Sequence, residues 1–144
     1  MPLVSRNRPR LTLEGARAVL EAAERRAHEI HRPMNIAVVD DGGHLLAFAR
    51  MDGAKPSSIE ISLTKARAAA LRRAPTGAPS REGQPNLLLA VGLAVARPDQ
   101  QTPVRGGVPL IVDGEVVGAI GLSAGSEDED SDVARAGAAA LEGA

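Results

Sequence analysis

Three histidines and two internal methionines are the side chains of this sequence that could bind a transition metal or haem iron through nitrogen or sulfur. They are His28, His31, His44, Met34 and Met51. His28 and His31 are three residues apart, so on a helix they would be neighbours. Such a pair supplies only two of the four ligands of a tetrahedral site, and solvated or capping histidines explain the same spacing. His44 directly follows a turn and is expected at the surface.

A second group of candidates combines acids with cations. Asp40 could act as a general base, although an aspartate before two glycines is also explained by its role in a turn. Lys65 and Arg105 could hold a carboxylate, the arginine in a bidentate manner, and each is also explained as an ordinary surface charge. Asp130 ends the acidic run 127–130, which a helix N-terminus explains better than a metal site does.

The composition limits the class of protein. A chain of 144 residues with 44% apolar content suits one domain with one core. The net charge of −1 and the single aromatic residue, Phe48, argue against a nucleic-acid partner. No apolar run approaches the length of a membrane span or of a signal-peptide core, so we expect no membrane partner and a cytoplasmic location. Residues 1–10 have no periodicity and are expected to form a flexible leader before a single domain at 11–144.

The elements that must position these residues follow from periodicity and turn signals. An apolar stripe predicts a first helix from the N-cap Thr12 to Ile30, closed by Pro33. Strands at 35–39 and 44–51 form a hairpin, and Ser57 and Glu60 predict a capping box that opens a second helix, on which Lys65 is expected to lie off the apolar stripe. The proline-rich segment 74–103 surrounds an apolar run at 86–95 that must pack on its own subunit or another.

The final third of the chain contains the clearest hairpin signal. Two aliphatic runs, 108–112 and 115–122, are separated by Asp113-Gly114, which favours a type I′ turn. Gly106 and Gly107 precede the hairpin, either for tight packing at the end of a sheet or for a backbone that faces a ligand. Ser126 and Glu129 predict a second capping box and a last helix. Two hairpins with flanking helices indicate an α+β fold with an antiparallel sheet.

Several short motifs occur in the order that is typical of a known family. They are NIAVVD at 35–40 with Gly43-His44, ARMDGA at 49–54, Ser58-Ile59, Lys65-Ala66, Pro75-Thr76, GGVP at 106–109, GEVVGAIG at 114–121, Ser123 and Asp130. In these segments the chain resembles the haem-binding GlcG/HbpS-like family, which also occurs as the C-terminal part of some corrinoid adenosyltransferases. The resemblance covers roughly Leu11 to Leu141 and implies a three-layer α/β/α, profilin-like domain with a five-stranded antiparallel sheet. It also implies assembly into homo-oligomers, from tetramers to octamers.

The resemblance further implies a small-molecule ligand, haem, and two alternative functions. In the first, His28 or His31 binds the haem iron, Leu87–Leu89 help to cover the macrocycle, and Arg105 or Lys65 pairs with a propionate. The matching Thr76, Gly106 and Gly107 complete the candidate ligand-binding set. In the second, the chain is a lyase or isomerase acting on an organic acid. Lys65 and Arg105 then bind carboxylate, and Asp40 or Asp130 is the base. Which alternative holds, and whether there is turnover, stays open at this point.

Overall fold

The computed structural model describes residues 1–144 as four helices, two short 3₁₀ turns and six strands. The helices are α1 (Leu13–Glu29), α2 (Ile59–Arg72), α3 (Leu87–Ala96) and α4 (Glu127–Ala138), with 3₁₀ turns η1 (Pro56–Ser58) and η2 (Ala139–Leu141). The strands are β1 (Asn35–Asp40), β2 (Leu45–Arg50), β3 (Ser80–Arg81), β4 (Gln84–Pro85), β5 (Gly107–Val112) and β6 (Glu115–Ser123). None of the helices combines the length and apolarity needed to cross a membrane.

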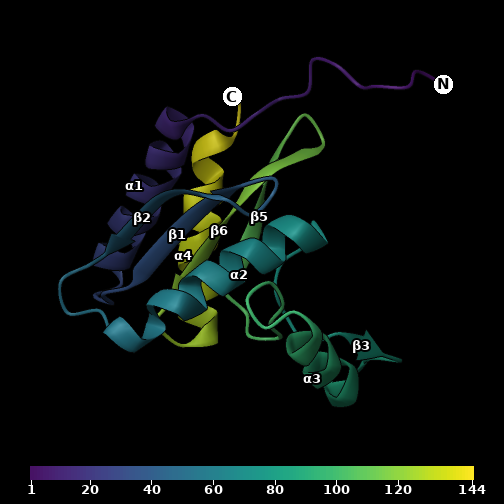
Figure 1. The fold of residues 1–144 in the computed structure, drawn as a ribbon. Coiled ribbons are helices and arrows are strands. Elements are labelled where there is room, and N and C mark those ends of the chain that lie inside the picture. The colour runs from purple at the N-terminus through teal and green to yellow at the C-terminus, as the bar shows by residue number, and fades with distance from the viewer.

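The main sheet has the strand order β2-β1-β6-β5, with every pair antiparallel. Helices α1 and α4 pack against each other on one face of this sheet, and α2 covers the other face (Figure 1). Alternate residues of β1 pack on the two faces of the sheet, because successive strand side chains point to opposite faces. Ile36 and Val38 belong to the core under α1 and α4, whereas Ala37 and Val39 pack under α2. The predicted α+β fold with an antiparallel sheet is therefore confirmed.

The prediction of a five-stranded sheet is wrong. The main sheet has four strands, and the only other strands, β3 and β4, form a separate two-stranded ribbon with two residues each. Prolines explain why the 74–103 segment adds no fifth strand, because proline lacks the N–H that a ladder needs. The edge strand β5 also contains Pro109, which suits an edge and discourages further pairing.

Local signals set most element boundaries. Thr12 caps α1 through a hydrogen bond from Gly15 N–H at 3.0 Å. Ser126 and Glu129 form the predicted capping box of α4. Asp113 and Gly114 both have positive φ, as a type I′ turn requires. The capping box predicted at Ser57 is wrong: Pro56 starts a 3₁₀ turn, so α2 begins only at Ile59 and its N-cap makes no side-chain hydrogen bond.

Glycines in β5 and β6 bring α2 unusually close to the sheet. A Cβ atom on Gly121 would lie 2.2 Å from the Ser62 carbonyl oxygen, and one on Gly107 would lie 2.3 Å from that of Lys65. Only glycine allows this approach of helix backbone to strand backbone. The close contact buries a wide face of α2 and takes Lys65 into the interior. The prediction that Lys65 lies off the buried stripe is therefore wrong.

Candidate functional site

His28 and His31 line one groove at the C-terminal end of α1. The groove encloses about 390 Å³ between this end of α1 and the residues that follow β2. Its lining combines imidazole, thioether, guanidinium and carboxylate groups with a few apolar surfaces. The lining residues are Glu24, Ala27, His28, His31, Arg32, Pro33, Met51 and Asp52.

The turn that ends α1 places His31 at the rim of this groove. The His31 N–H donates to the His28 carbonyl and the Arg32 N–H donates to the Ala27 carbonyl, at 3.1 and 3.0 Å. These are the two hydrogen bonds of a Schellman motif, whose left-handed position is usually glycine. His31 occupies that position with φ of 55°. A histidine therefore stands where glycine is usual, with its backbone fixed by the helix end.

The other groove residues complete a varied donor set. His28 is 69% exposed, and its Nε2 lies 3.7 Å from Oε1 of Glu24. Met51 lines the groove, and its sulfur accepts a hydrogen bond from the Met34 N–H at 3.4 Å. Arg32 bonds Glu129 at 3.1 Å, and a hydrogen bond from the Ser126 backbone, aided by Arg32, lowers the pKa of Glu129. The groove thus brings two imidazoles and a guanidinium together on a lining that also includes Met51.

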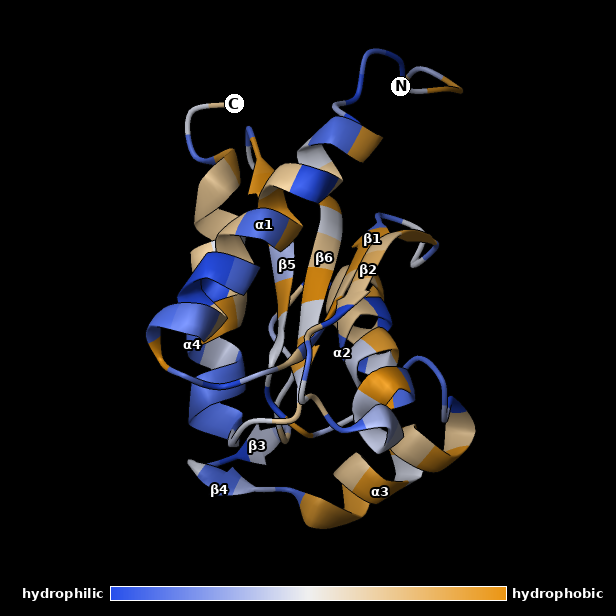
Figure 2. Ribbon diagram, turned by 90° about the vertical axis from the view of Figure 1, so that its left-hand side faces the viewer, coloured by the Kyte–Doolittle hydropathy of each residue, from blue (hydrophilic) through white to orange (hydrophobic).

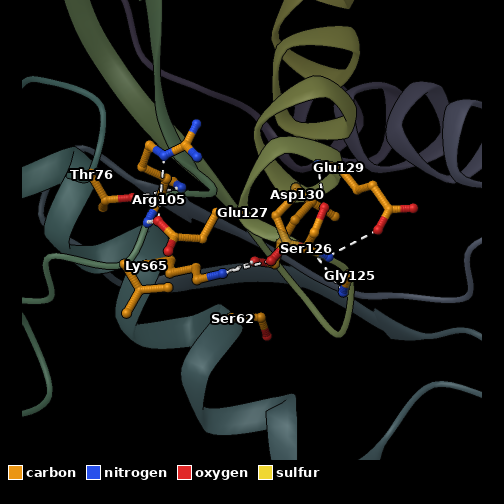
Figure 3. Close-up of polar contacts among 12 residues, drawn as sticks. Ser62, Lys65, Thr76, Arg105, Gly125, Ser126, Glu127, Glu129 and Asp130 are labelled. Atoms are coloured by element: carbon orange, nitrogen blue, oxygen red, sulfur yellow. Dashed lines mark hydrogen bonds and ion pairs between the residues drawn. The ribbon is translucent and has the colours of Figure 1, made fainter.

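Lys65 and Asp130 form a second, closed cluster between α2, α4 and β6 (Figure 3). The Lys65 Nζ donates to Asp130 Oδ2 and to the Leu122 carbonyl, both at 2.8 Å. Asp130 Oδ1 accepts the Gly125 N–H at 3.1 Å. The two side chains are 1% and 3% exposed. Burial raises the pKa of Asp130, and the Lys65 ammonium opposes that effect only in part.

The segment beside this ion pair is closely packed; it contains Gly106, Gly107 and Thr76. A Cβ on Gly106 would lie 2.9 Å from the Lys65 Nζ and 2.8 Å from the Asp130 Cβ. The Thr76 hydroxyl accepts the Gly107 N–H at 2.9 Å, and both residues are buried. Of the two explanations considered for this glycine pair, the structure shows tight packing against α2 and α4.

Arg105 lies at the surface beside this cluster. Its guanidinium contacts Asp128 at 2.8 Å and Glu127 at 3.4 Å, and its backbone N–H donates to Glu127. The hydrogen bond to Asp128 raises the pKa of Arg105. The arginine is therefore already paired with the first turn of α4, as Figure 3 shows for Glu127.

Asp40 lies at the opposite end of β1 from the Lys65 cluster. Asn35 pairs with Ser123 near the cluster, whereas Asp40 pairs with Gly118, five residues along the strand and about 16 Å away at the usual rise. The Asp40 carboxylate accepts the N–H groups of Gly42 and His44, and lies 3.2 Å from the His44 Nδ1. Partial burial acts to raise the pKa of Asp40, but these hydrogen bonds outweigh it and lower the pKa.

The structure thus separates residues that the sequence analysis had grouped. Lys65 and Asp130 come together with Arg105 beside them, but Asp40, the alternative base, does not converge on them, and both cations are paired with acids of α4. Leu87–Leu89 lie on α3, and neither they nor Lys65 and Arg105 line the histidine groove. The cation that does line it, Arg32, was missed, as were Glu24 and Asp52. Arg32 directly follows His31, so the helix end was a usable signal, but Asp52 joins the groove only through the fold.

An α+β domain with an antiparallel sheet and an exposed histidine groove is the class of protein that these observations define. Residues 11–139 match the sequence profile of the family described as "Haem degrading protein HbpS-like". The chain is 39% identical over 113 residues to the protein GlcG of Escherichia coli strain K12, and the alignment covers 78% of this chain and 81% of GlcG. The chain therefore belongs to the HbpS-like family, as the order of its motifs predicted.

Two solved structures show the same fold. The crystal structure of HbpS superimposes with a TM-score of 0.77 and 36% identity, over 95% of this chain and 94% of the HbpS chain. The crystal structure of a PduOC–haem complex superimposes with a TM-score of 0.79 and 26% identity, over 92% of this chain and 96% of the other. One structural relative is thus a haem complex.

Proposed function

We propose that this protein binds haem in the groove at the end of α1, with His28 or His31 as the iron ligand. The observation that carries the proposal is the convergence of both histidines with Met51 and Arg32 on one open groove. The family description and the haem complex of PduOC support the same ligand. Bound haem would supply redox-active iron chemistry.

The residues of the groove suit the parts of a haem molecule. Imidazole is a common axial ligand of haem iron, and a thioether is another. Ala27, Pro33 and Met51 provide apolar surface for a macrocycle, and a guanidinium matches the carboxylate of a propionate. We therefore assign propionate pairing to Arg32, which lines the groove and also contacts Glu129, in place of Lys65 and Arg105, which do not line it.

Glu24 has a supporting role in this proposal. When it contacts the imidazole of His28 it orients the ring and fixes which nitrogen faces the groove. His31 has no such carboxylate partner, but its backbone turn restricts where its side chain points. The two histidines are therefore positioned by different means, one by a side chain and the other by the helix end.

We also propose self-association, with the tetramer-to-octamer range that the family resemblance implies. Exposed apolar side chains on the single chain support it independently. Light scattering of the purified protein measures the mass against the 14.8 kDa of one chain. A single-chain mass across the micromolar range would refute this proposal.

A haem titration with matched histidine variants tests the binding site. Wild type, His28→Ala, His31→Ala and the double variant are titrated with hemin while the Soret band is recorded. We expect saturation at one haem per chain in the wild type and loss of the band shift in one single variant and in the double variant. Reaction of the bound haem with peroxide, followed as bleaching of the band, then distinguishes binding from degradation.

His44→Ala is the control, because His44 is an exposed histidine outside the groove. Its titration should match that of the wild type. Arg32→Ala should keep the iron ligand but weaken binding, by about tenfold for one lost charged hydrogen bond. If the double histidine variant binds haem as the wild type does, the proposed ligand assignment is wrong.

A further inference from the structure

One arginine on α2 is half-buried and has no polar partner within the chain. The arginines that are not exposed are Arg26, Arg67 and Arg72. Arg26 forms an ion pair with Asp132, and Arg72 donates to the Gly77 carbonyl. Arg67 makes no hydrogen bond or ion pair through its side chain. A guanidinium that has lost part of its hydration gains from an anionic partner, so Arg67 points to a ligand that comes from outside the chain.

Arg67 lines a pocket of about 330 Å³ between the β1–β2 turn, α2 and residues 99–100. His44, Asp99 and Gln100 supply further polar groups to the lining. Figure 2 shows that the turn is hydrophilic, whereas the two strands that it joins are largely hydrophobic. The histidine groove lies at the other end of this hairpin, after β2, and shares no lining residue with the pocket. The pocket is therefore a separate site, at the small end of the range of ligand pockets.

The β1–β2 turn supports the stem of Arg67. Gly43 is buried and has φ of 82°, and a Cβ atom there would lie 3.5 Å from the Arg67 Cγ. The turn backbone therefore lies against the methylene chain of the arginine, and the head group stays available at the pocket. A stem that is already held in place loses less conformational entropy when the guanidinium binds a ligand.

Asp40 orients the imidazole of His44, which is the next residue of the turn. The His44 Nδ1 lies 3.2 Å from Asp40 Oδ1. An ionised carboxylate can only accept hydrogen bonds, so Nδ1 carries the hydrogen of this contact. The Nε2 of His44 is then left without a partner, on a side chain that is 82% exposed. Protonation of Nε2 makes His44 a second cationic donor beside Arg67.

The far wall of the pocket adds an amide and a carboxylate. The side-chain oxygen of Gln100 accepts a hydrogen bond from Arg97, which leaves the amide nitrogen of Gln100 as a donor. The Asp99 carboxylate makes no hydrogen bond or ion pair within the chain. A carboxylate repels an anion but accepts a hydrogen bond from a hydroxyl group. The pocket thus combines donors for an anion with one acceptor for a hydroxyl.

We infer that this pocket binds a small phosphate ester that also carries a hydroxyl group. The planar fork of Arg67 can hold two phosphate oxygens while His44 donates to a third. A carboxylate has only two oxygens, which the guanidinium alone can occupy, so the second donor favours phosphate. Asp99 then accepts the hydroxyl of the ligand. The inference goes beyond haem binding and uses none of the groove residues.

Calorimetric titration at constant ionic strength tests the site with methyl phosphate, glycerol phosphate and acetate. We expect both phosphate esters to saturate at one molecule per chain, glycerol phosphate to bind more tightly than methyl phosphate, and acetate to bind more weakly than either. Arg67→Gln should weaken both esters by about tenfold or more, and Arg67→Lys should recover only part of that loss. Arg17→Gln, at an exposed arginine on α1, is the matched control and should bind as the wild type does.

Variants at two exposed positions keep the test valid if Arg67→Gln proves unstable. His44→Ala should weaken both esters by about threefold or more, for one lost donor. Asp99→Ala should bind methyl phosphate more tightly, because a repulsive charge is gone, and should lose the preference for glycerol phosphate. Absence of saturation in the wild type overturns the inference, as does an equal loss in Arg17→Gln and Arg67→Gln. Acetate that binds as tightly as methyl phosphate overturns the assignment of phosphate.

Discussion

The Lys65–Asp130 pair and the His28–His31 groove show how differently one fold can hold chemically capable side chains. In the first region every charged atom is buried and has a close partner. In the second region the histidines face an open groove, and their contacts to other side chains are long or absent. Burial and full hydrogen bonding make the first region a part of the fold. Exposure and unsatisfied donors make the second available for a ligand.

The same contrast separates two kinds of cost. A complete buried ion pair changes the free energy of unfolding little. Removing one partner lowers it strongly, because the other charge is then left without a partner in a low-dielectric interior. Removing the side chain of an exposed histidine usually changes stability little. Removal of a side chain should therefore lower stability in the first region and weaken binding in the second. The backbone of His31 is the exception in the second region, because its positive φ links a substitution there to stability.

Breaking the ion pair should give the largest effect. Lys65→Met leaves the buried Asp130 carboxylate without its ammonium, and should lower the free energy of unfolding by about 3–5 kcal/mol. Urea unfolding at pH 7 measures the change. The double variant Lys65→Met/Asp130→Leu removes both charges and should recover most of the loss. If Lys65→Met costs less than about 1 kcal/mol, the pair is not the buried, satisfied unit described above.

The stability of Lys65→Met should also depend on pH, because this variant leaves Asp130 as an unpaired buried carboxyl. Burial raises the folded-state pKa of Asp130 above 3.8, so protonation of this carboxyl favours folding. Stability from this group is fully present below pH 3.8 and is lost as the pH rises through the raised pKa. Without Lys65 the pKa rises further, so the variant should lose least at about pH 4 and most at about pH 7.

Linkage gives the expected decrease in the stability penalty of Lys65→Met on acidification. The penalty should fall by roughly 1.4 kcal/mol for each pH unit that separates the folded and unfolded pKa values. Unfolding curves at several pH values between about 4 and 7 measure it. The control is the double variant Lys65→Met/Asp130→Asn. It has no carboxyl at this position, so its stability penalty should not decrease on acidification. A constant penalty across the range would show that Asp130 is not buried as an isolated charge in the single variant.

Most signals carried by adjacent residues could be predicted from the sequence, except at Ser57, where Pro56 starts a 3₁₀ turn in place of the expected capping box. Contacts created by the fold could not be predicted. The type I′ turn at Asp113-Gly114 and the capping box at Ser126 depend on a few neighbouring residues, and both were predicted. The burial of Lys65 depends on glycines in strands that are distant along the chain, which allow α2 to approach the sheet. Helical spacing takes no account of that approach, so it predicted that Lys65 would lie off the buried stripe.

The candidate site divides in the same way. Helical spacing correctly made His28 and His31 neighbours, because residues three apart on a helix lie close together. The sequence did not show that Asp52 would join them, since that contact requires the β1–β2 hairpin to return to the end of α1. It also did not reveal that Asp40 lies at the other end of β1 from Asp130.

A glycine substitution at the groove should raise stability while harming binding. His31 adopts the left-handed conformation that glycine accepts without cost. His31→Gly should therefore raise the free energy of unfolding by about 1 kcal/mol, whereas His31→Ala should leave it nearly unchanged. Thermal or urea unfolding checks both. Equal stability of the three proteins would argue against strain at this position, and with it against a functional reason for the histidine.

Substitution of Asp40 should give the smallest effect and the opposite pH dependence to the buried pair. The backbone N–H groups of Gly42 and His44 hold the pKa of Asp40 below 3.8, so its contribution to stability is present above pH 3.8 and is lost as the pH falls below it. Asp40→Asn keeps an acceptor oxygen and should cost less than about 1 kcal/mol at pH 7. Unfolding measured at about pH 7 and pH 3 should show the difference from wild type shrinking at the lower pH. A difference that grows on acidification would mean that Asp40 is held like Asp130, by burial, and the distinction between an exposed turn carboxylate and an interior one would fail.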